Sequence, residues 1–162
     1  MTKEEFKNLF ETSFDEVRRY ILYRSGDSEA ATDIAQDVFL NIWEKNRDVA
    51  LPVSKGLLFK IAADKFISRY RREKLAFNFF RSFRFNEQDY SPEELMSFKQ
   101  LKSAYETALE RMPEKQRAVF LMSRVEKLKY HEIAGLLGLS VKAVEKRMKH
   151  ALEFLRISLD IK

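Results

Sequence analysis

Hydrophobic residues recur every three or four positions along most of the chain, which is the spacing of amphipathic α-helices. The first such stretch follows Thr2 and Glu5, which have the spacing of a capping box, and it continues to about Arg24. Gly26-Asp27-Ser28 ends this stretch and offers N-caps to a second helix. A third helix is predicted from Lys55, after the break at Leu51-Pro52-Val53-Ser54.

The second half has equally clear helix boundaries. Ser91-Pro92-Glu93-Glu94 predicts the start of a fourth helix, which runs to about Arg111, and Met112-Pro113-Glu114 starts a fifth. A short helix over Tyr130 to Leu137 and a long one from Val141 to about Leu159 complete the pattern. The sequence therefore predicts an all-α protein of two small helical domains, residues 1–75 and 93–162, joined by a linker at residues 76–92.

The last two predicted helices have the spacing of a helix-turn-helix. Ala134 is a small residue where the helices cross, Gly138 suits a turn with positive φ, and Val144 is a plug between the helices. Ser140 would cap the second helix. We expect the inward residues Val144, Met148, Ala151, Leu152 and Leu155, and the outward residues Lys142, Glu145, Lys146, Arg147 and Lys149. The outward set suits the DNA major groove, and a helical hairpin without DNA contact is the alternative.

Aromatic and basic residues alternate along the third predicted helix. Phe59, Phe66 and Tyr70 are interleaved with Lys60, Lys65, Arg69, Arg71 and Arg72. Basic side chains hold phosphates while ring faces stack on unpaired bases, so this pattern is typical of single-strand binding. Alternatively, the aromatics belong to the hydrophobic core and the bases to a solvated face.

Charge alternates in blocks along the chain. Residues 1–50 carry 7 basic and 11 acidic side chains, whereas residues 51–86 carry 9 and 2. Residues 87–110 carry 2 and 6, and residues 111–162 carry 12 and 6. Two basic blocks separated by acidic ones indicate two separate contacts with a polyanion.

Composition narrows the function classes. The 162 residues include no Cys and 2 His, which excludes disulfides, zinc ribbons, iron–sulfur clusters and a thiol nucleophile and argues against a histidine-rich metal site. No window resembles a membrane span or a signal peptide. We therefore expect a cytoplasmic protein without membrane insertion and without cofactors.

The motifs together resemble a known family. The stretch 108–120 and the helix-turn-helix at 130–145 are similar to region 4 of the extracytoplasmic-function sigma factors, small members of the bacterial sigma-70 family. Residues 32–43 resemble the family's region 2.2, and residues 58–72 resemble regions 2.3 and 2.4. The resemblance covers nearly the whole chain. Residues 141–156 also resemble the iron-uptake-type sigma factors.

The resemblance implies two functions for the N-terminal domain. Region 2.2 grips the clamp helices of the RNA polymerase core, which implies polymerase binding by Asp33, Gln36, Asp37, Phe39 and Trp43, although the two aromatics could equally be core residues. Regions 2.3 and 2.4 open the minus-10 element and capture a flipped base. This role would fall on Asp64, Lys65, Phe66, Arg69, Tyr70, Arg71 and Arg72.

Region 4 implies a second DNA contact and a second polymerase contact. It reads the minus-35 element and docks on the polymerase flap, which assigns DNA binding to Ser140, Lys142, Ala143, Glu145, Lys146, Arg147 and Lys149.

The chain departs from the family at Ala63-Asp64, where an Arg-Asn pair is usual. Because a carboxylate accepts hydrogen bonds and donates none, Asp64 favours an exposed cytosine amino group.

These features predict a promoter-specificity subunit of RNA polymerase that is not an enzyme, with promoter DNA, core polymerase and an anti-sigma factor as partners. The phenylalanine-rich segment 77–85 is unusual for the family's linker. We hypothesise that in the free protein it extends the third helix and packs against region 4, or is covered by the anti-sigma factor. Two alternatives remain open. One is a stand-alone helix-turn-helix regulator, and the other is a metal-dependent nuclease using Asp33, Asp37 and Glu44.

Overall fold

The described part of the chain consists of helices and their connections. The structure is a computed structural model and describes residues 1–47, 52–72 and 91–160. Most of the predicted linker, including the segment 77–85, lies outside the described residues. In chain order the helices are α1 (Lys3–Ser25), α2 (Ser28–Lys45), α3 (Lys55–Arg72), α4 (Pro92–Arg111), α5 (Glu114–Arg124), α6 (Tyr130–Leu137) and α7 (Val141–Ser158). The predicted all-α class and helix boundaries are confirmed.

Local capping chemistry explains most of these boundaries. Thr2 with Glu5 and Ser91 with Glu94 form the predicted capping boxes at the starts of α1 and α4. The Asp27 side chain caps α2 by accepting a hydrogen bond from the backbone N–H of Ala30, at 3.0 Å. These helices therefore begin where their own sequences satisfy the free N–H groups of the first turn.

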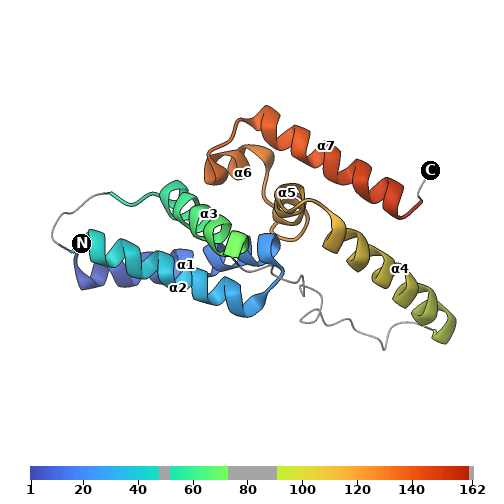
Figure 1. Cartoon of the computed structure of the whole chain (residues 1–162), viewed down its shortest axis with the longest axis horizontal. Helices are drawn as coiled ribbons and strands as arrows, with labels where there is room; N and C mark the ends of the chain where they lie inside the picture. The colour runs from blue at the N-terminus through green and yellow to red at the C-terminus, as the bar shows by residue number, and fades with distance from the viewer. Residues whose placement is uncertain (48–51, 73–90, 161–162) are drawn as a thin grey trace.

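Helices α1, α2 and α3 form one bundle (Figure 1). The face of α1 with Val17 and Ile21 packs against Val38 of α2 and Leu58 of α3, and all four side chains are buried. Between α1 and α2, an aromatic cluster joins Phe39 and Trp43 to three phenylalanines of α1, namely Phe6, Phe10 and Phe14. The bundle thus presents the outer faces of α2 and α3 to solvent.

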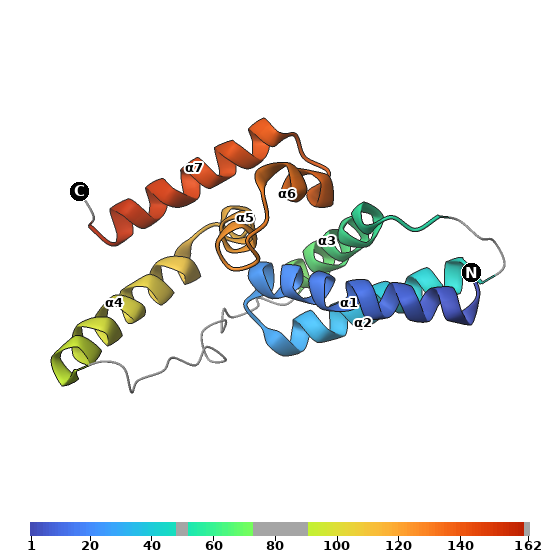
Figure 2. The same cartoon turned by 180° about the vertical axis from the view of Figure 1, so that it is seen from behind.

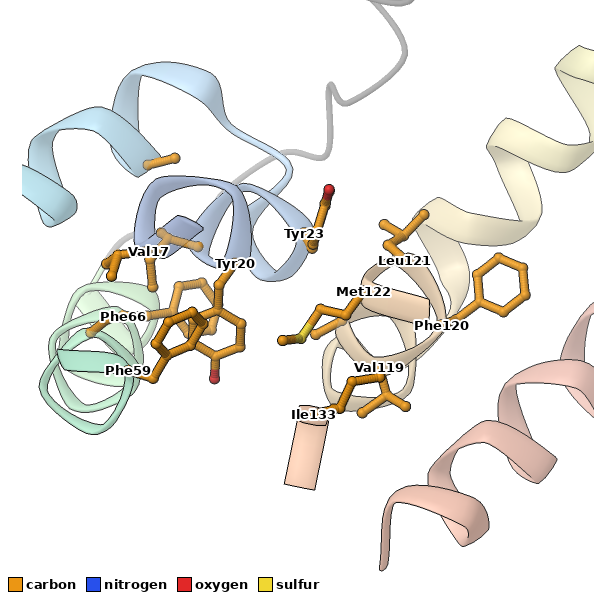
Figure 3. Packing of buried hydrophobic residues seen from close by; sticks show 14 of the residues in the cluster. Val17, Tyr20, Tyr23, Phe59, Phe66, Val119, Phe120, Leu121, Met122 and Ile133 are labelled. Carbon is orange, nitrogen blue, oxygen red and sulfur yellow. The ribbon is translucent and has the colours of Figure 1, made fainter. Parts of the chain in front are cut away.

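The remaining helices surround α5. This short helix lies between α1 and α7, and α6 lies beside α3, while α4 extends away from the bundle (Figures 1 and 2). Met122 of α5 points toward Tyr20 of α1, near Phe59 of α3 (Figure 3). The buried residues form one continuous hydrophobic cluster that runs from α1–α3 to α5–α7. In the ranges 1–47, 52–72 and 91–160, no helix has the length and apolar character needed to cross a membrane.

Candidate nucleic-acid and polymerase interfaces

Helices α6 and α7 form the predicted helix-turn-helix. Gly138 ends α6 in the left-handed conformation, with φ of 64°, and Ser140 caps α7 by accepting from the backbone N–H of Ala143 at 3.1 Å. Val144 is fully buried between the helices, and Ala134 is buried at the crossing. The small residue, the turn glycine and the plug therefore occupy the predicted places.

The two faces of α7 differ sharply in chemistry. Met148, Ala151 and Leu155 are buried with Val144, whereas exposed side chains cover the outer face, namely Lys142, Glu145, Lys146 and Lys149. Ala143 is half-buried and Ser140 is exposed. The outer N-terminal half of α7 is therefore a basic surface of the size that enters a major groove.

Two residues of α7 differ from the prediction. Leu152 is 42% exposed, so its assignment to the inner face was wrong. It follows buried Met148 by four positions and exposed Lys149 by three, so it lies at the border between the two faces of the helix. Arg147 is half-buried and lies close enough to Tyr20 of α1 for its charge to oppose the burial-induced rise in the pKa of that phenol.

The candidate minus-10 residues on α3 divide into exposed and buried groups. Asp64, Tyr70, Arg71 and Arg72 are exposed, and Lys65 and Arg69 are partly so. Phe66 is 1% exposed, because the Arg24 guanidinium covers its ring at 4.5 Å and Tyr70 lies against it at 5.5 Å. Phe66 is thus a core residue in this conformation, as the alternative interpretation of the aromatics has it, and Tyr70 is the exposed ring.

The candidate polymerase-binding residues on α2 divide in the same way. Asp33, Gln36 and Asp37 form an exposed polar stripe. Phe39 is 1% exposed and Trp43 is half-buried, with its ring 4.9 Å from that of Phe6. Phe39 is thus a core residue in this structure, the alternative that the sequence left open, because it faces the aromatic residues of α1.

Leu40 is a residue of α2 that sequence reasoning missed. It is 53% exposed and follows Gln36 and Asp37 by four and three positions, which places it on the same helix face. That spacing was the available signal. The surface formed by Asp33, Gln36, Asp37 and Leu40, here called the α2 face, combines acidic groups with one exposed apolar side chain.

An ion pair links the α2 face to α3. The Arg69 guanidinium lies 3.6 Å from the Asp33 carboxylate, and both side chains are partly solvent-exposed. Such a pair contributes little stability.

In the part of the chain that the structure describes, no three His, Cys, Asp or Glu side chains gather as a metal site.

A polar interface between α1 and α5 was also missed by sequence reasoning. Arg24 donates two hydrogen bonds to the Glu114 carboxylate, at 2.6 and 2.8 Å. Burial acts to lower the pKa of Arg24, but hydrogen bonding to Glu114 and nearby negative charge outweigh it and raise that pKa. The Tyr23 phenol donates to Glu126, which also pairs with Arg19 at 2.6 Å.

Arg117 of α5 completes this interface with four hydrogen bonds to backbone carbonyls. It donates to Tyr23 and Arg24 at the end of α1, and to Leu109 and Met112 at the end of α4. Burial lowers the pKa of its guanidinium to about 10, so the side chain is protonated at neutral pH. One side chain thus caps the C-terminal ends of two helices.

Comparisons with known proteins agree with this architecture. A family model described as "Sigma-70, region 4" matches residues 102–155. The ferric citrate uptake sigma factor FecI of Escherichia coli is 27% identical over 150 residues, which cover 91% of this chain and 87% of that protein. The ECF RNA polymerase sigma factor SigE of Mycolicibacterium smegmatis is 26% identical over 148 residues, which cover 88% of this chain and 56% of SigE.

A solved structure has the same fold along the whole chain. It is the sigma factor RpoE of Bartonella quintana in complex with the anti-sigma factor NepR, with a TM-score of 0.62 and 17% identity over 98% of this chain and 99% of that one. Residues 102–155 thus match region 4 of the sigma-70 family, and about nine-tenths of the chain is similar to sigma factors. The curated relatives and the structural neighbour are all named as sigma factors, and SigE is named as an ECF RNA polymerase sigma factor.

Proposed function

We propose that the protein directs core RNA polymerase to promoters through three separate surfaces. The outer N-terminal half of α7 binds the duplex minus-35 element, the exposed end of α3 binds the melted minus-10 element, and the α2 face binds the clamp helices of the polymerase. The observation that carries this proposal is the capped helix α7, with Lys142, Lys146 and Lys149 exposed beside a buried Val144 plug.

We assign a different function to each part of the chain. We assign residues 1–75 to polymerase and minus-10 binding, residues 76–92 to the linker, and residues 93–162 to minus-35 and flap binding. The match of the region 4 model to residues 102–155 supports the C-terminal boundary. In this assignment the protein is a binding subunit that carries no active site and no cofactor, and it works in the cytoplasm with the nucleoid-bound polymerase.

An anti-sigma factor is the expected regulator. The structural neighbour RpoE is bound to the anti-sigma factor NepR, which supports a partner of this class for the present chain.

The relative FecI has a ferric citrate uptake role, and the likeness supports assignment to the iron-uptake-type group. The regulated promoters then belong to genes for iron acquisition, which transcript profiling of a strain lacking the protein would test.

Factor-dependent run-off transcription tests the proposed function. Core polymerase with this protein should produce a transcript from a cognate promoter, while core polymerase alone should not. A stand-alone helix-turn-helix regulator would instead bind duplex DNA tightly and give no transcript with core polymerase. Absence of a transcript from every promoter in a genomic library would contradict the proposal.

Replacing Lys142 and Lys146 by Ala should weaken promoter binding without abolishing transcription at high protein concentration. Each lysine that contacts a phosphate contributes about 0.9 to the slope of log K against log salt concentration. Fluorescence-anisotropy titrations of the polymerase complex at several salt concentrations measure that slope. The paired control is Lys3→Ala with Lys7→Ala, which removes the same charge from exposed positions on α1 and should leave the slope unchanged.

Replacing Asp64 by Asn should relax base preference at the minus-10 element. The exposed Asp64 carboxylate only accepts hydrogen bonds, so it favours a cytosine amino group, whereas an amide both donates and accepts. One such contact is worth about 1–3 kcal/mol, or roughly 5- to 150-fold in preference for cytosine. Transcription from promoters randomised at minus-10 measures the change, and an unaltered preference would show that Asp64 does not read the base.

A further inference from the structure

A cleft of about 620 Å³ lies between α1, α3, α5 and α6, and none of the three proposed binding surfaces includes it. Its volume falls within the range of roughly 300–1,000 Å³ that small-molecule sites occupy. Gly56 of α3 and Gly135 of α6 line the cleft without filling it. Among the described residues, a Cβ placed on Gly135 would have no neighbour within 4 Å beyond its own stretch of helix. The cleft is therefore space that a ligand can enter.

Buried side chains form the floor of the cleft, and this floor carries no charge. Tyr20 of α1, Phe59 of α3 and Met122 of α5 line it, and each is at most 5% exposed (Figure 3). The centroids of the Tyr20 and Phe59 rings lie 5.2 Å apart. The Tyr20 hydroxyl accepts a hydrogen bond from Arg24, and burial raises the pKa of this phenol, so it stays neutral. The floor therefore offers ring faces and a thioether to a planar apolar group.

Charged side chains form the rim of the cleft, and one carboxylate there differs from the others. The rim contains two ion pairs, Glu16 with Lys55 at 3.0 Å and Arg19 with Glu126 at 2.6 Å. Glu132 of α6 is exposed and makes no ion pair with any described residue. One of its oxygens accepts a hydrogen bond from the backbone N–H of Lys129 at 2.8 Å. The Glu132 carboxylate is thus the rim charge that has no counter-ion in the described chain.

The charge balance of the cleft favours a cation. Its lining contains three carboxylates, two basic side chains and His131, which gives an excess of one negative charge when the histidine is neutral. Because the other two carboxylates are paired, this excess is located at Glu132. The faces of aromatic rings also attract cations. A ligand that joins an aromatic ring to an ammonium group would match both the floor and the rim.

We propose that this cleft binds a small aromatic amine, with its ring against Tyr20, Phe59 and Met122 and its ammonium group at Glu132. Since the walls come from four helices, the bound ligand would stabilise the folded chain and raise its Tm with ligand concentration. Binding is a property of the isolated protein, so it is measured without polymerase or promoter DNA.

Nuclear magnetic resonance titration with tryptamine tests the site. The sequence has four Gly, of which Gly56 and Gly135 line the cleft, while Gly26 and Gly138 do not. The backbone amide signals of the two cleft glycines should shift on titration, whereas those of the other two serve as internal references. We expect a dissociation constant of about 0.1–1 mM for a ligand of this size. Unmoved signals from both cleft glycines at 10 mM tryptamine, about tenfold above that range, would overturn the site.

A change of ligand charge tests the proposed class of ligand. Indole-3-propionate has the same ring system but carries a carboxylate, and at low ionic strength it should bind at least about fivefold more weakly than tryptamine. Glu132→Gln should weaken tryptamine binding by about two- to fivefold, since an exposed ion pair is worth that much. Glutamine still accepts the hydrogen bond that caps α6. The matched control is Glu11→Gln on the exposed face of α1, which should leave the affinity unchanged. Equal affinities for the two indoles would overturn the cationic class.

Filling the cleft tests the position of the ring. Gly135→Leu adds a side chain where the cleft is open, and leucine favours a helix more than glycine does. This variant should lose at least about tenfold in tryptamine affinity while circular dichroism shows that its helices remain. Ser103→Leu adds the same side chain to an exposed position of α4 and should bind tryptamine like the wild type. Wild-type affinity in a folded Gly135→Leu variant would overturn the assignment of the ring to this cleft.

Discussion

Replacing Arg117 by Met should lower the free energy of unfolding by about 3–5 kcal/mol, because several buried carbonyl acceptors lose a charged donor at once. Arg117 is buried and donates to four carbonyls at the ends of α1 and α4. Met fills similar volume but donates no hydrogen bond, so these carbonyls would be left in a dry environment. At this chain length, the loss corresponds to a decrease in Tm of roughly 6–20 °C.

Two further variants separate the role of Arg117 from a general effect of removing an arginine. Arg117→Lys keeps the charge but cannot reach four carbonyls at once, so we expect a smaller loss, of about 1–3 kcal/mol. Arg111→Met changes an exposed arginine of α4 and should alter stability by less than about 0.5 kcal/mol. Urea unfolding followed by circular dichroism measures all three. Equal stabilities for Arg117→Met and Arg111→Met would contradict the capping role.

Replacing Leu40 by Asp should weaken binding to core polymerase by about tenfold to a hundredfold, as expected for an apolar anchor at the centre of an interface. Leu40 is the exposed apolar member of the α2 face and lies one turn after Gln36 and Asp37. A carboxylate there would require desolvation on binding and could not fill an apolar pocket. Binding of labelled protein to core polymerase, measured by anisotropy, gives the affinity.

The matched control for Leu40 is Leu101→Asp. Leu101 is 59% exposed on α4, so the substitution makes the same chemical change on a different helix. It should leave the affinity for core polymerase within about twofold, since substitutions outside an interface core are nearly neutral. If both substitutions weaken binding equally, the α2 face is not the polymerase contact.

The helices were predictable because their boundaries depend on neighbouring residues. The capping boxes at Thr2 and Ser91, the Asp27 cap and the turn at Gly138 are local features, and the structure contains each of them. The helix-turn-helix was predictable for the same reason, since Ala134, Gly138 and Val144 lie within eleven residues. Local spacing was therefore sufficient to predict both the fold class and the candidate minus-35 surface.

For Phe66 and Phe39 the sequence left a core role and a binding role both open. Both lie in segments with the composition of a binding surface, and their burial depends on α1, which brings Arg24 over one ring and Phe6, Phe10 and Phe14 around the other. Periodicity shows that a helix has an apolar face but not what covers it. Local spacing therefore could not decide whether these two rings are buried or exposed.

The polar interface between α1 and α5 could not be predicted from the spacing of residues, because its partners are far apart in the chain. Arg24 and Glu114 are separated by 90 positions. One local signal did exist at Arg117, which precedes Phe120 and Leu121 by three and four positions and so lies in the apolar stripe of α5. An arginine in an apolar stripe requires buried acceptors, and the carbonyl ends of α1 and α4 supply them.

The same separation of Arg24 and Glu114 has a consequence during synthesis. Helices α1 to α3 leave the ribosome before α5 exists, and at about 5–20 residues per second the intervening 90 positions take roughly 5–20 s to translate. Throughout that interval the end of α1 exposes Arg24 and the apolar surface later covered by Met122. The nascent chain therefore lacks the partner that covers this surface in the folded protein until α5 emerges and docks.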